Sequence, residues 1–104
     1  MAWLILFVAG LCEIAWAIGL KFTDGFTRTV PTVIVVAAMI ASVWLLAIAL
    51  KTIPVGTGYA VWTGIGAAGT FMVGVLYYGD PTSLARYLGV ALIIAGVITL
   101  KLAH

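Results

Sequence analysis

The stretch PTVIVVAAMIASVWLLAIAL, residues 31–50, decides the fold because it contains twenty consecutive residues without an acidic or basic side chain. A helix rises about 1.5 Å per residue, so about 20 apolar residues cross the hydrocarbon core of a bilayer. Its first residue, Pro31, suits the first position of a helix, where the missing N–H is not needed. The stretch therefore predicts a membrane-spanning helix over residues 31–50.

Three further apolar segments predict helices over about residues 3–20, 55–78 and 84–101. A turn signal at Asp24-Gly25 and a break at Gly79-Asp80-Pro81 separate them. Residues 51–56 form a very short connection, so the second and third helices should make an antiparallel hairpin. The apolar segments are continuous and do not alternate at period two, which argues against a β-barrel. In lipid, the remaining way to pair the backbone N–H and C=O groups is through the internal hydrogen bonds of helices.

The composition agrees with a membrane protein. Of the 104 residues, 65 % are hydrophobic and 8 % are charged, and the mean hydropathy is +1.31, whereas about a quarter of the residues of a soluble domain are charged. We therefore predict a single all-α integral membrane domain, residues 1–104, with four transmembrane helices. No basic residue precedes the first apolar segment, so we expect a retained helix and not a cleaved signal peptide.

Several functional classes are excluded. A net charge of +2, scattered along the chain, is too small to indicate nucleic acid binding. The lone Cys12 has no partner for an internal disulfide and no spacing partner for a metal. The chain has no Ser/His/Asp set, no metal-ligand cluster and no glycine-rich phosphate loop. We therefore expect no enzymatic activity, no cofactor and no metal.

Positive charge is almost evenly divided between the two sides of the predicted membrane domain. Lys51 and Lys101 lie on the side of the N-terminus, and Lys21, Arg28 and Arg86 lie on the other. The positive-inside rule therefore fixes no orientation. The chain either inserts both ways and pairs head to tail, or has one weakly biased orientation. Four helices barely enclose a pathway, which favours an oligomer.

The segment GLCEIAWAIGLK, residues 10–21, carries a single acid, Glu13. It lies about ten residues from the start of the helix, at about 15 Å and near mid-membrane. An ionisable group there costs several kcal/mol unless it is neutralised, paired or hydrated. No basic residue is available at mid-membrane, so Glu13 is a candidate for exchanging a proton for a cation. The alternative is a permanently protonated Glu13 that hydrogen-bonds a neighbouring helix.

The face around Glu13 favours a binding site. Gly10 and Trp16 lie three residues before and after it and share its face. Gly10 leaves space, and Trp16 supplies an aromatic wall with one N–H donor, although a tryptophan here could equally face lipid. Tyr59 and Trp62, three apart in the third helix, can donate to a carboxylate and face a cation, or can belong to an interfacial aromatic belt.

Ser42 is the polar side chain deepest in the second helix. It can join the same network or bond its own backbone. Gly64 and Gly66, at the middle of the third helix, permit close helix approach and bending. Gly89 and Gly96, seven residues apart in the fourth helix, form a packing stripe that suits a dimer seam.

Three blocks of sequence carry a family resemblance: EIAWAIGLK at residues 13–21, GFTR at residues 25–28 and KTIPVGTGYAVWTGIG at residues 51–66. With four predicted spans and one acid in the middle of the first, the chain resembles the small multidrug resistance transporters over essentially its whole length. It is most similar to their guanidinium exporter subtype, because Trp16 stands where the polyaromatic-cation branch typically has a small residue.

The resemblance implies an antiparallel, dual-topology homodimer, which we expect to lie in the inner (plasma) membrane. Glu13 of both subunits would line one shared site and exchange protons for guanidinium or small guanidinyl cations. The resemblance also implies roles for further positions. Hydrogen bonding around the acid is implied for Trp16, Ser42, Tyr59 and Trp62. The bend of the third helix is implied for Gly64 and Gly66, and the fourth-helix contact for Gly89 and Gly96. The function predicted is proton-coupled export of guanidinium.

Three other functions stay open at this point. A broad quaternary-ammonium exporter of the same family would use the same acid, although Trp16 weighs against it. A non-transporting membrane assembly subunit would use Glu13 to hold helices together. A passive channel would conduct without a proton gradient.

Overall fold

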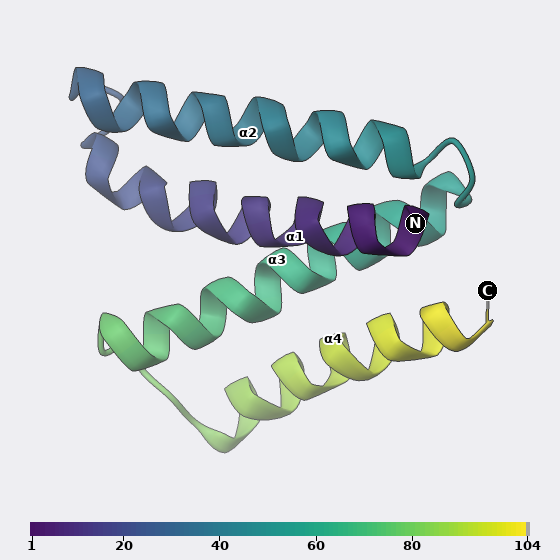
Figure 1. Cartoon of the computed structure of the whole chain (residues 1–104). Coiled ribbons are helices and arrows are strands. Elements are labelled where there is room, and N and C mark those ends of the chain that lie inside the picture. Colours follow the sequence, from purple (N-terminus) through teal and green to yellow (C-terminus); the bar gives the residue numbers. More distant parts are fainter. Residues whose placement is uncertain (104) are drawn as a thin grey trace.

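A computed structural model describes residues 1–103, and its long elements are all helical (Figure 1). They are α1 (Ala2–Gly19), the 3-10 helix η1 (Leu20–Thr23), α2 (Thr29–Ala49), α3 (Val55–Tyr77) and α4 (Leu84–Ala103). Each of the four α-helices is long and apolar enough to cross a membrane, and no strand occurs in the described residues. The all-helical membrane class predicted from the sequence is confirmed.

The helix limits differ from the expected ones by a few residues. α2 begins at Thr29, so Pro31 lies inside its first turn and does not open the helix. The first turn tolerates proline because its N–H groups have no intrahelical acceptor. α1 ends at Gly19 and continues as η1, and α4 extends to Ala103, beyond the expected residue 101.

The connection after η1 is a tight reversal held by a threonine. Asp24, Gly25 and Phe26 all have left-handed backbone conformations, with φ of 49°, 69° and 67°. Thr23 is buried, and its Oγ1 donates to Leu20 O at 2.8 Å and accepts from Phe26 N at 3.2 Å. This turn brings α2 back along α1, which Figure 1 shows as two neighbouring antiparallel helices.

α1 is the central helix of the protomer. It packs against α2 and α3, whereas α4 packs along α3 (Figure 1) and reaches α1 through the Lys101 side chain, whose ammonium group faces the Trp3 ring. α1 and α3 run parallel, because α2 reverses direction between them. The main buried cluster lies toward the N-terminal end of α1 and is formed by Leu6, Ala9, Leu46, Ala49, Ile53 and Val61.

Glycines set the closest approach of α1 to α3. A Cβ added at Gly10 would lie 2.7 Å from Cγ2 of Ile65, and one added at Gly69 would overlap the side chain of Ile14. Each helix therefore places a glycine opposite an isoleucine of the other helix. The resulting register places Glu13 of α1 level with Gly66 of α3.

α4 is the least buried helix, with no buried residue along its length. Gly64 marks its contact with α3, because an added Cβ there would lie 2.6 Å from Cγ2 of Val97. Nothing lies within 4 Å of the corresponding positions at Gly89 and Gly96, so this stripe is uncovered in the protomer. Its role as a dimer seam remains a prediction.

Candidate functional site

A hydrogen-bonded chain links three helices one turn before Glu13. Nε1 of Trp62 on α3 donates to Oγ of Ser42 on α2 at 2.9 Å, and Ser42 Oγ donates to the carbonyl of Ala9 on α1 at 2.8 Å. Ser42 is 0 % exposed. Since polar groups buried in lipid need partners, this chain fixes the relative depth of α1, α2 and α3.

Ser42 thus donates to a different helix. The alternative from the sequence, a hydrogen bond to the backbone of its own helix, is not what the structure has. The Trp62 N–H is occupied by Ser42, so within this protomer it does not donate to Glu13. Tyr59 lies beside Trp62, with ring centroids 5.6 Å apart and planes inclined by 52°. Tyr59 is 56 % exposed, so the aromatic pair presents one ring to the outside of the protomer.

Replacing Ser42 with alanine is expected to destabilise the protomer. The change removes both hydrogen bonds of Ser42 and leaves the partly buried Trp62 N–H unpaired, at a cost of about 1–3 kcal/mol. Unfolding by denaturant in detergent micelles measures the loss. Thr63→Ala, on an exposed part of α3, is the matched control. A Ser42→Ala protein as stable as this control would contradict the structural role of the chain.

Glu13 lies half-buried on α1 with its carboxyl group directly over Gly66. A Cβ at position 66 would lie 2.5 Å from Cδ of Glu13 and 2.6 Å from its Oε1, so the carboxyl occupies the space that a side chain would need. Its Oε2 is buried and has no hydrogen-bond partner within residues 1–103. A buried carboxylate oxygen without a partner is costly unless a proton or a cation joins it.

Trp16 follows Glu13 by one helical turn on the same face. Its Nε1 is also buried and without a partner among the described residues. The protomer therefore presents two unsatisfied polar groups, an acceptor at Glu13 and a donor at Trp16, on one face of α1. The acceptor at Glu13 suits a ligand that brings its own N–H groups, whereas the Trp16 N–H is a donor only and needs an acceptor such as a carboxylate oxygen.

The structure places the predicted residues around Glu13 on two sides of this acid along the helix axis. Gly10, Ser42, Tyr59 and Trp62 lie on the N-terminal side of Glu13, and Trp16 lies on the other. The contact of Gly66 with Glu13 was not expected, because we assigned Gly66 to close helix approach and bending and not to a contact with the acid. No sequence signal identifies this contact, since it depends on the register between α1 and α3.

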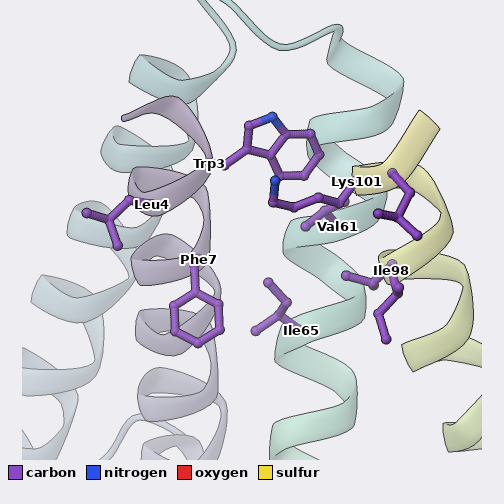
Figure 2. Close-up of a pocket in the computed structure, with 9 residues that line it drawn as sticks. Trp3, Leu4, Phe7, Val61, Ile65, Ile98 and Lys101 are labelled. Carbon is purple, nitrogen blue, oxygen red and sulfur yellow. The ribbon is translucent and has the colours of Figure 1, made fainter. Parts of the chain in front are cut away.

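A cavity of about 530 Å³ lies away from Glu13, between α1, α3 and α4 (Figure 2). Figure 2 shows the Lys101 side chain close to the Trp3 ring, and the ammonium nitrogen lies 5.0 Å from the ring centroid. The other lining residues are apolar: Leu4, Phe7, Val61, Ile65, Val97, Ile98 and Leu102. An apolar groove with a single charge at its end does not supply the acceptors that a cation needs.

The described residues contain no group of three or more His, Cys, Asp or Glu side chains that could hold a metal. The chemistry available near mid-membrane is therefore that of a single carboxyl group flanked by aromatic and small residues. Such a group binds either a proton or a cation.

Comparison with known proteins agrees with this arrangement. A family model described as Small Multidrug Resistance protein matches residues 1–93. This chain belongs to the small multidrug resistance family. In bacteria, a four-helix member of the small multidrug resistance family is a multi-pass protein of the inner membrane.

Relatives within the small multidrug resistance family are similar over their whole length. The chain is 58 % identical over 103 residues to a guanidinium exporter of Yersinia pseudotuberculosis serotype I (strain IP32953), a match that covers 99 % of each chain. It is 55 % identical to a guanidinium exporter of Citrobacter freundii, covering 99 % of this chain and 98 % of the relative. A guanidinium exporter of Proteus vulgaris is 53 % identical, with 99 % of both chains covered. Their names indicate transport and not an enzymatic reaction.

Proposed function

We propose that this protein exports guanidinium and small guanidinyl cations in exchange for protons, and that Glu13 of two subunits binds both. The observation that carries the proposal is the Glu13 carboxyl group, half-buried in a membrane helix over Gly66 with a buried oxygen that has no partner. The full-length similarity to proteins named guanidinium exporters supports the choice of substrate.

Guanidinium suits this site by its shape and its donors. It is planar, its charge is delocalised, and its N–H groups match carboxylates in forked pairs. It is also less strongly hydrated than an ammonium ion, which lowers the cost of entering a low-dielectric site. Because a carboxylate that binds a proton no longer attracts the cation, the two ligands compete and export is coupled to proton entry.

The proposed active form is an antiparallel homodimer. The protomer places the Glu13 carboxyl group over Gly66 of α3, and five cavities of about 140–530 Å³ are lined by residues other than Glu13. A second, inverted copy would bring a second carboxylate and the rest of the wall. It would also act as the inverted half that alternating access requires. The even distribution of positive charge permits both orientations.

Proteoliposomes loaded with guanidinium test the proposed function. An inward proton gradient is expected to drive guanidinium out, and collapse of the gradient with a protonophore is expected to stop the flux. A passive channel would continue to conduct without the gradient. An assembly subunit would give no flux at all. Either result would contradict the proposal.

Replacing Trp16 with glycine is expected to loosen selectivity toward larger cations. Loss of the aromatic wall beside Glu13 enlarges the site, so the affinity ratio of a bulky aromatic cation to guanidinium should rise at least about tenfold. Competition binding in detergent measures this ratio. Trp44→Gly is the matched control, because Trp44 is exposed on α2 and the change costs a similar helix propensity. An unchanged ratio in Trp16→Gly would count against the wall role.

A further inference from the structure

A second cavity, of about 140 Å³, lies one turn beyond Glu13 at the C-terminal ends of α1 and α3. It is lined on one side by Ala17, Ile18 and Lys21, and on the other by Thr70, Gly74, Tyr78 and Asp80. In contrast to the apolar groove of Figure 2, most of these side chains bear polar groups. The cavity is not part of the hydrogen-bonded chain through Ser42.

Thr70 connects this cavity to the level of Glu13. Its Oγ1 is buried and has no hydrogen-bond partner among residues 1–103. Thr70 follows Gly66 by four residues, and Ala17 follows Glu13 by four, so each lies one turn further along the same face of its helix. Because Gly66 lies under the Glu13 carboxyl group, Thr70 lies one helical turn beyond that carboxyl group along the α1–α3 seam.

Charged and aromatic groups lie at the outer end of the same cavity. The Lys21 ammonium nitrogen lies 4.4 Å from the centroid of the Tyr78 ring. Asp80 N donates to the carbonyl of Gly74 at 3.1 Å, and the Asp80 carboxylate packs onto Gly74 where a Cβ would otherwise lie. Lys21, Tyr78 and Asp80 are all exposed, so this end of the cavity borders the aqueous surface.

Water is the ligand that this arrangement fits. A buried hydroxyl without a partner is costly in a low-dielectric setting, and a water molecule in a polar cavity satisfies it. A volume of about 140 Å³ holds several water molecules. A threonine hydroxyl both donates and accepts, so it can lie within a continuous hydrogen-bonded file.

We propose that this cavity holds a water file that carries protons between Glu13 and the surface near Lys21 and Asp80, with Thr70 as its positioning residue. The Glu13 carboxyl gives one proton to the nearest water, each member of the file accepts one proton and passes one on, and the last water releases it at the surface. The inference rests on the proposed proton coupling and adds the route by which the proton reaches Glu13.

The test compares Thr70→Val with Thr70→Ser. Valine keeps the volume of threonine and removes the hydroxyl, whereas serine keeps the hydroxyl. The measurement is the rate of proton release after rapid mixing with guanidinium in weakly buffered detergent containing a pH dye. Loss of one ordinary hydrogen bond from the file should slow release about tenfold in Thr70→Val. Equilibrium guanidinium affinity, read by titration, should stay within about twofold.

Thr63→Val, exposed on α3, is the matched control and should behave as the wild-type protein. Thermal unfolding checks that all variants are equally folded. The inference is overturned if Thr70→Val releases protons as fast as wild type, or if Thr70→Ser is as slow as Thr70→Val. If the wild-type protein itself releases no proton on binding guanidinium, the proposed function fails, a result that is distinct from either of these.

Discussion

Glu13→Gln is expected to abolish proton-driven guanidinium flux. Glutamine keeps the volume of the side chain and its ability to hydrogen-bond, but it carries no charge and exchanges no proton. Removing one member of a desolvated, hydrogen-bonded charge pair costs about 2–5 kcal/mol, so guanidinium affinity should fall by at least about thirtyfold. Flux in proteoliposomes and titration in detergent measure the two losses separately.

Asp24→Asn is the matched control for this change. Asp24 lies in the exposed turn after η1 with φ of 49°, a conformation that asparagine adopts readily. The Asp24→Asn substitution removes one acidic charge outside the membrane-spanning helices, so transport should be unchanged. If Glu13→Gln transports guanidinium as well as Asp24→Asn does, Glu13 is not the site of exchange.

Gly66→Ala is expected to weaken transport while leaving the fold intact. The new Cβ would lie within 2.8 Å of three atoms of the Glu13 side chain, so the carboxyl group has to move. Because these atoms are the far end of a flexible side chain, the backbone need not shift. A displacement of about 1 Å can cost up to about a hundredfold at a site that needs defined geometry. We expect guanidinium affinity to fall about tenfold to a hundredfold.

Gly66→Ala is expected to leave the stability of the protein unchanged or to raise it, although it weakens transport. Alanine is favoured over glycine in a helix interior by about 1 kcal/mol, so the midpoint of unfolding should be unchanged or higher. Gly56→Ala is the control on the same helix, because nothing lies within 4 Å of its added Cβ. A Gly66→Ala protein that binds guanidinium as well as Gly56→Ala would show that the position of the carboxyl group over Gly66 does not matter.

The fold could be predicted largely from the sequence because the membrane imposes it. An uncharged stretch such as residues 31–50 has few alternatives to a spanning helix in lipid. Helix ends were less predictable, and α2 begins at Thr29 because a proline is tolerated anywhere in the first turn. The short η1 helix after Gly19 was not predicted, since a few polar and aromatic residues give no periodic signal.

The candidate site was predictable only in part. Glu13 could be identified as a functional residue from its depth alone, because an acid near mid-membrane is rarely incidental. Its contact with Gly66 and the bond from Ser42 to Ala9 depend on the rotation and register of packed helices, which a single sequence does not reveal. Thr70 was missed for the same reason. Part of the cavity wall around Thr70 comes from Ala17, Ile18 and Lys21, which are far away in the chain.

Guanidinium binding measured against pH tests the central claim most directly. If protons and guanidinium compete for Glu13, the apparent affinity should fall as the pH is lowered through the range in which Glu13 takes up a proton, and guanidinium added to the protonated site should release protons in proportion to the sites filled. In Glu13→Gln, this pH dependence and the proton release should both be lost. An affinity independent of pH, with no proton released by the wild-type protein, would contradict the account.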